Sequence, residues 1–129
     1  MTDSRPDIAT EADVQLLVDT FYAKVNHDAL LAPVFNGFAH VDWSRHLPRM
    51  YDFWSGLLLG TSRYLGRPFP KHVPLPIDGT HFQRWVALFK ATVNELFAGP
   101  KAEEAKLRGQ SIAQVFEVRL QECGPLTIL

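Results

Sequence analysis

The sequence has little cysteine, no long apolar run and almost no net charge, and each shortage excludes a class of protein. A single cysteine, Cys123, excludes an internal disulfide and any zinc or iron–sulfur site that needs several cysteines. No apolar stretch approaches the roughly 20 residues of a membrane-spanning helix. The formal net charge of −1 gives no electrostatic reason to expect nucleic acid or an anionic membrane as a partner.

The first eleven residues, MTDSRPDIATE, lack the basic start and apolar core of a signal peptide. The 129 residues fit one domain, residues 1–129, and 47% hydrophobic residues are enough for a packed core. With charged residues at 21%, intrinsic disorder is not expected. We therefore expect a single folded domain in the cytoplasm.

Apolar residues recur at helical spacing along most of the chain. Thr10 and Asp13 form the pattern of a capping box, and the apolar stripe that follows ends near Asn26. Further stripes predict helices from about Trp43 to Gly60, from about Thr80 to Gly99-Pro100, and from about Lys101 to Gly124-Pro125. Four such helices predict an all-α domain of two packed layers.

Three segments between or within these helices are less regular. Pro48 conflicts with a helix that begins at Trp43, so the regular helix is expected either to start close to Leu47 or to have a bent first turn. A short helical turn is expected over residues 28–35, broken by Asn36-Gly37. The glycine- and proline-rich residues 60–79 predict an ordered loop with at most one helical turn around His72.

Polar aromatic side chains interrupt three of the apolar stripes. Tyr22 follows Phe21 on the first helix, His46 precedes Met50 by one turn on the second, and Trp85 follows Phe82 on the third. Each has an apolar body and one hydrogen-bonding group, so the three could converge on a small polar ligand. The alternative is that each is a core residue whose polar atom bonds to the backbone.

His72 lies in the proline-rich loop, between Pro70 and Pro74. Fixed backbone angles suit a side chain that must keep one orientation, and a neutral imidazole is a good metal ligand. The alternative is an ordinary surface histidine. The spacing of the five histidines matches no zinc motif.

The order of several motifs is more specific than any one of them. The runs TFYAKV, LLAPVFN, DWSRHLPRMYDFWSGLLLG, YLGRPFPKH and HFQRWVALFKATV together resemble the third class of truncated haemoglobins, which are small bacterial globins. The resemblance covers residues 8–123. It implies a shortened globin fold, two helices packed over two around a haem.

The resemblance also implies roles for particular residues. His72 matches the proximal iron ligand, Tyr22 and Trp85 match the distal tyrosine and tryptophan, and His46 matches a distal-helix histidine whose role is less settled. Further matches and neighbours are expected to line the haem pocket: Phe21, Phe35, Met50, Phe53 and Trp54. Because the chain lacks Cys-x-x-Cys-His, the cofactor would be haem b, held without thioether links.

Three functions follow as hypotheses. The first is reversible binding of diatomic gases (oxygen, nitric oxide, carbon monoxide) at ferrous iron. The second is an enzyme that oxidises nitric oxide to nitrate or activates peroxide; it would need a separate reductase, because no Gly-x-Gly-x-x-Gly nucleotide motif is present. The third is a haem-free helical interaction module. Basic residues that could face haem propionates are Arg45, Arg49, Arg63, Arg67 and Lys71.

Overall fold

Helices account for nearly all regular structure in the part of the chain that the computed structural model describes, residues 5–38, 42–61 and 79–123. The α-helices are α1 (Glu11–Asn26), α2 (Trp43–Leu59), α3 (Gly79–Leu96) and α4 (Pro100–Cys123). A short π-helical turn, η1 (Pro33–Phe38), lies between α1 and α2. No strand occurs in these ranges, and the all-α fold predicted from the sequence is confirmed.

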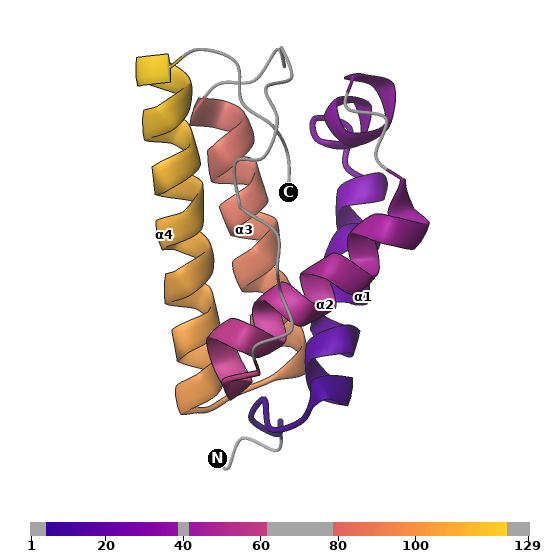
Figure 1. Cartoon of the computed structure of the whole chain (residues 1–129), viewed down its shortest axis with the longest axis vertical. Coiled ribbons are helices and arrows are strands. Elements are labelled where there is room, and N and C mark those ends of the chain that lie inside the picture. The colour runs from indigo at the N-terminus through magenta and orange to yellow at the C-terminus, as the bar shows by residue number, and fades with distance from the viewer. Residues whose placement is uncertain (1–4, 39–41, 62–78, 124–129) are drawn as a thin grey trace.

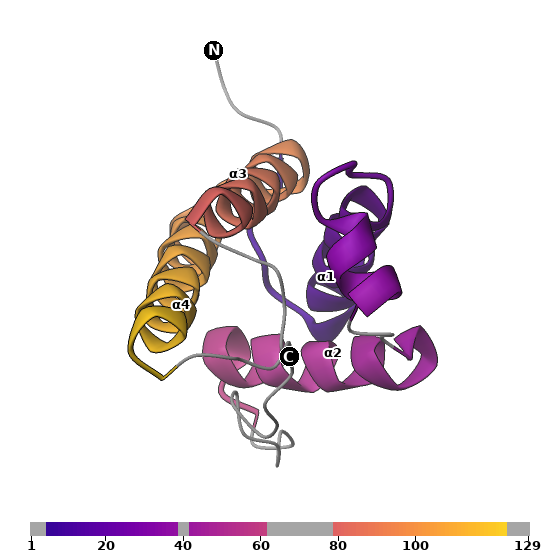
Figure 2. The ribbon, with the colours of Figure 1, turned by 90° about the horizontal axis from the view of Figure 1, so that it is seen from above.

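The four helices form two pairs. α3 and α4 run antiparallel and pack side by side, whereas α2 crosses α1 (Figures 1 and 2). The pairs meet mainly through α1 and α3, and more weakly through α2 and α4. This is the expected arrangement of two helices over two.

The first helix begins as its sequence predicts. The Asp13 amide donates to the Thr10 hydroxyl at 3.3 Å, and the Thr10 amide donates to the Asp13 carboxylate at 3.0 Å. These reciprocal bonds satisfy amides that have no partner inside the helix. The buried stripe of the helix that starts here includes Phe21 and Tyr22.

Of the two alternatives for α2, a start close to Leu47 is wrong, because the helix is continuous from Trp43 with Pro48 inside it. A bent first turn stays a prediction. Asp42 caps this first turn, accepting from the Ser44 amide at 3.2 Å and from the Ser44 hydroxyl at 2.7 Å. Proline leaves the carbonyl four residues before it without an intrahelical partner. Here that residue is Ser44, which is exposed, so the cost is small.

The turn between α1 and α2 also differs from expectation. It is a π-helix that runs through Asn36 and Gly37 instead of ending there. The Asn36 side chain donates to the Ala32 carbonyl at 3.1 Å and thereby satisfies a backbone acceptor within the turn. Asn36 thus supports this turn, where the sequence pattern suggested a breaker.

The segment before α1 reaches across the molecule to the start of α4. The Asp7 carboxylate accepts from the backbone amides of Lys101 at 3.0 Å and Ala102 at 2.8 Å. Burial opposes the charged form of Asp7, but these bonds outweigh it and lower the pKa. Asp7 therefore stabilises the N-terminus of α4 from a distant point in the sequence.

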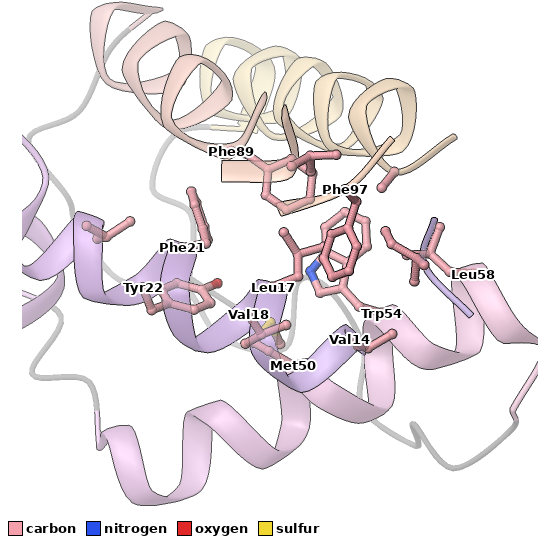
Figure 3. Close-up of a cluster of buried hydrophobic side chains, with 14 of the residues drawn as sticks. Val14, Leu17, Val18, Phe21, Tyr22, Met50, Trp54, Leu58, Phe89 and Phe97 are labelled. Carbon is pink, nitrogen blue, oxygen red and sulfur yellow. The ribbon is translucent and has the colours of Figure 1, made fainter. Parts of the chain in front are cut away.

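The core lies between the two helix pairs. Figure 3 shows Leu17 and Phe21 of α1, Trp54 of α2 and Phe89 of α3 among its side chains. Trp54 stacks on Phe89 with ring centroids 4.8 Å apart. Behind Phe89, a Cβ atom added at Gly109 of α4 would lie 2.6 Å from the phenyl ring, so α4 approaches α3 closely only with glycine there. None of the described helices is both long and apolar enough to cross a membrane.

Candidate functional site: an aromatic cluster between α1, η1 and α2

Tyr22 is the one buried residue of α1 with a polar side-chain atom. Its side chain is 5% exposed, and its ring meets Phe21 edge-to-face at 4.9 Å and His46 at 5.2 Å. Burial raises the pKa of the phenol well above its ordinary value. The hydroxyl therefore stays protonated at any physiological pH and remains a hydrogen-bond donor.

His46 comes from the first turns of α2 and is 7% exposed. Its Nε2 atom is buried and has no hydrogen-bond partner among the described residues. Burial, and secondarily the charge of Arg49, lowers the pKa of His46 to about 4, so the ring is neutral at neutral pH. A buried polar atom without a partner is rare in native proteins and needs an explanation, such as a ligand.

Phe35 and Trp43 join these two residues. The indole of Trp43 lies 5.9 Å from Phe35, nearly parallel to it, 5.3 Å from Tyr22 and 5.5 Å from His46. Phe35 in turn meets Tyr22 edge-to-face at 6.1 Å. We call Tyr22, Phe35, Trp43 and His46 the aromatic cluster. Trp43 was not among the expected site residues, although its position one turn before His46 on the same face could have indicated it.

Trp85 reaches the cluster through Phe21. Its indole meets Phe21 edge-to-face at 5.1 Å and stacks on Phe89 at 5.5 Å. Trp85 is half-buried, so part of its ring lies at the edge of the core. Of the three polar aromatic residues predicted from sequence, the structure brings Tyr22 and His46 into ring contact, whereas Trp85 is linked to Tyr22 only through Phe21.

The other expected lining residues of α2 divide between two faces. Met50 is 1% and Trp54 3% exposed, and both belong to the core shown in Figure 3. Phe53 is only partly buried and lines a groove of about 430 Å³ against α4, together with Leu57, Glu104, Leu107, Arg108, Ser111 and Ile112. Phe53 therefore faces α4, whereas Met50 faces α1 and the core.

His72, the expected iron ligand, lies outside the described residues, as do Arg63, Arg67 and Lys71. Of the remaining basic candidates, Arg45 is exposed and lies 3.6 Å from the Asp42 carboxylate. The described ranges contain no group of three or more His, Cys, Asp or Glu side chains suited to hold a metal ion.

The aromatic cluster combines flat rings with two polar atoms that suit a small ligand. The Tyr22 hydroxyl is a protonated donor, and the Nε2 atom of the neutral His46 ring forms no hydrogen bond with the residues that the structure describes. A hydrogen bond made among buried apolar side chains is stronger than the same bond in water. The aromatic cluster therefore combines flat apolar faces with two hydrogen-bonding atoms, a set of groups that suits a planar apolar ligand with a small polar group.

Comparisons with known proteins give one consistent result. The family model described as bacterial-like globin matches residues 7–116. The chain is 32% identical over 118 residues to the group 3 truncated hemoglobin ctb of Campylobacter jejuni, covering 88% of this chain and 93% of the relative. It also resembles the crystal structure of a group III truncated hemoglobin from Campylobacter jejuni, with a TM-score of 0.75 and 31% identity, over 93% of this chain and 95% of that one.

Proposed function

The chain belongs to the bacterial-like globin family and is a haem-binding globin, and we propose that it binds oxygen and other diatomic gases reversibly at ferrous haem b. The observation that carries the ligand-binding part of this proposal is the buried Nε2 of His46, which lies beside Tyr22 and has no hydrogen-bond partner in the part of the chain that the structure describes. A small ligand between the cluster and the haem would supply the missing partner.

When bound, the haem iron supplies the position at which a diatomic gas binds. The chain's own residues then decide how tightly the gas is held. We propose that the Tyr22 hydroxyl donates a hydrogen bond to it, since burial keeps this hydroxyl protonated. The Trp85 indole is a second donor, which approaches from α3 beside Phe21.

His46 contributes differently because its ring is neutral. A neutral imidazole has one N–H donor and one acceptor nitrogen, and a hydrogen bond at either nitrogen fixes the tautomer. We propose that His46 bonds to the gas or to a water molecule that the gas displaces. The low pKa, about 4, prevents a charge from appearing in the pocket in the physiological range.

We propose His72 as the proximal ligand, on the basis of the YLGRPFPKH motif. Haem attachment is non-covalent in this proposal because the chain lacks the paired cysteines of thioether-linked haem. In this proposal Phe35, Met50 and Trp54 supply apolar side chains near the porphyrin. Phe21 lies between Tyr22 and Trp85 and contacts both rings.

The absorption spectrum of the purified protein tests the first step. We expect a Soret band that corresponds to about one haem per chain, and a ferrous form that takes up and releases oxygen without being consumed. A protein that takes up no haem would contradict the proposal. Oxygen association and dissociation rates from stopped flow then measure the ligand affinity.

Mixing the oxygenated protein with nitric oxide tests the proposed role as a reversible gas binder. If gas binding is the function, nitrate formation should stop after about one equivalent per haem, with a ferric product. Nitrate formation sustained over many cycles when a reductase is supplied would contradict it and indicate a nitric oxide dioxygenase. In that case we expect NADH or NADPH alone not to restore the ferrous form, because the sequence contains no Gly-x-Gly-x-x-Gly motif and a separate reductase would be required.

A further inference from the structure

We propose that Asn36 and Trp43 form a positioning unit that holds the rings of Tyr22 and His46 in the orientation needed to bind the gas. The inference rests on the proposed function, since the gas is the ligand whose binding these rings control. It assigns a role to Asn36 and Trp43, which the sequence analysis did not identify as site residues.

Trp43 contacts the other three residues of the aromatic cluster. It is the first residue of α2, and its indole contacts a ring from each of the three elements: Tyr22 of α1, Phe35 of η1 and His46 of α2. Tyr22 and His46 also contact each other. A rotation of the Trp43 indole about its Cβ–Cγ bond therefore cannot occur without displacing at least one of these rings.

A hydrogen bond prevents this rotation. The Trp43 Nε1–H donates to the Asn36 Oδ1 atom at 2.8 Å, and the Asn36 Nδ2 atom donates to Asn26 Oδ1 at 2.8 Å and to the Ala32 carbonyl at 3.1 Å. Asn26 is the last residue of α1. The side-chain amide of Asn36 thus links the end of α1 and the turn at η1 to the indole at the start of α2, and holds that indole in place.

His46 depends on this fixed indole more than an ordinary buried histidine would. Its Nε2 atom has no partner among the described residues, so a hydrogen bond at that atom does not hold the ring. The edge-to-face contacts of Trp43 and Tyr22 instead define its plane, at interplanar angles of 83° and 81°. Pro48 also removes one backbone bond from the same helical turns.

Two substitutions separate the hydrogen bond from the ring. Asn36→Ala removes the acceptor, and Trp43→Phe keeps a ring but removes the N–H. Asn94→Ala is the matched control. Asn94 lies on α3, outside the aromatic cluster, and its side chain accepts a hydrogen bond from Lys106 of α4 at 2.8 Å. Asn36→Asp is a second variant that keeps an oxygen acceptor for the indole but loses the Nδ2 donor to Asn26 and Ala32.

The first readout uses the protein before haem is added and does not depend on gas binding. The chain has three tryptophans, so its ¹H–¹⁵N spectrum has three indole signals. We expect Trp43→Phe to remove one signal and Asn36→Ala to shift that same signal together with the ring signals of Tyr22 and His46. In Asn36→Asp the indole signal should stay closer to wild type.

The second readout uses the haem-loaded protein. Oxygen dissociation should become about 3- to 10-fold faster in Asn36→Ala and in Trp43→Phe, a coupling of the size expected for residues in contact. The infrared carbon monoxide stretch should shift or split as the rings spread over several orientations. The double variant should add little to Trp43→Phe, because Asn36 acts through the indole. Asn94→Ala should match wild type.

Some results would overturn the inference. Ring signals of Tyr22 and His46 that do not change in Asn36→Ala would show that Asn36 does not position them, whether or not the protein binds haem. An unchanged oxygen dissociation rate and carbon monoxide stretch, with only a lower unfolding temperature, would show a purely structural role. A wild-type protein that takes up no haem would instead contradict the proposed function, and the ring signals would still decide the inference.

Discussion

The carboxylate of Asp28 accepts a 2.6 Å hydrogen bond from Nε of Arg84. Asp28 follows α1, which carries Tyr22, and Arg84 directly precedes Trp85 on α3. The other oxygen of Asp28 accepts from the backbone amides of Leu30 and Leu31 at 3.0 Å each. A single buried carboxylate thus joins the turn before η1 to α3.

We expect Asp28→Asn to lower the free energy of unfolding by about 1–3 kcal/mol at pH 7, since it weakens bonds to a charged acceptor. Burial favours the neutral carboxyl, but the Arg84 bond and the two amide bonds outweigh it and lower the pKa of Asp28. A carboxyl with a lowered folded-state pKa stabilises the fold above its unfolded pKa and loses this contribution as pH falls through the folded value. The loss should therefore be full at pH 7 and shrink below about pH 4.

Urea unfolding at both pH values measures this difference. Glu95→Gln is the control, because Glu95 is half exposed and pairs with Lys24 on the surface at 2.6 Å. It should change the free energy of unfolding by less than about 1 kcal/mol. If Asp28→Asn lowers the free energy of unfolding equally at acid pH and at pH 7, the negative charge of Asp28 is not the source of the stabilisation.

His72→Ala should abolish most haem retention, because apolar contacts alone would remain to hold the porphyrin. The matched control is His27→Ala, which removes an exposed histidine whose ring contacts the Ala23 carbonyl at 2.8 Å. Resonance Raman of the ferrous protein should show an iron–histidine stretch in wild type and His27→Ala. If this stretch survives in His72→Ala, the assignment of His72 is wrong.

Tyr22→Phe should speed oxygen dissociation about 10- to 150-fold, the equivalent of the roughly 1.5–3 kcal/mol of a hydrogen bond to a partly charged acceptor. Tyr51→Phe is the matched control. Its hydroxyl donates to the Asp19 carboxylate and lies outside the aromatic cluster. Burial and that bond raise the pKa of Tyr51 to about 12, but dissociation should not change when its hydroxyl is removed.

Trp85→Phe should also speed oxygen dissociation, if the indole N–H reaches the gas from its place beside Phe21. The phenylalanine keeps the stacking surface for Phe89, so a change in rate reports the lost donor. Stopped-flow dissociation measures both variants. If Tyr22→Phe and Trp85→Phe both release oxygen at the wild-type rate, Tyr22 and Trp85 are core residues and not ligand donors.

His46→Ala tests whether the histidine reaches the iron. The sequence predicts that His46 is mobile, because Pro48 weakens the same helix, and this stays a prediction. In the structure the helix is continuous and the His46 ring is buried. If His46 ligates iron, the ferrous spectrum without gas should show low-spin bands that His46→Ala abolishes. A wild-type spectrum that is already five-coordinate, with gas entry unaffected by the variant, would limit His46 to lining the pocket.

Local signals in the sequence predicted much of the fold and part of the site. Helix caps, apolar spacing and Gly-Pro pairs act over a few residues, and they correctly placed all four helices. The stripes also identified Tyr22 and His46, which the structure brings to ring contact at 5.2 Å. At Pro48 they left two alternatives, and the Asp42 cap, which keeps the first turn helical, excludes a start close to Leu47. They failed at Asn36, whose side-chain bonds support a π-helical turn.

The sequence by itself determined the helical fold, its two layers and the polar residues on each stripe, because these depend on periodicity within one segment. The tertiary structure decided which distant residues meet. Asp7 caps α4 through Lys101 and Ala102, and Asp28 pairs with Arg84, although no local pattern relates these positions. Trp43 is the clearest case for the site. Its spacing indicates only a helix face, and its role follows from the packing of α1, η1 and α2 around one indole and the amide that holds it.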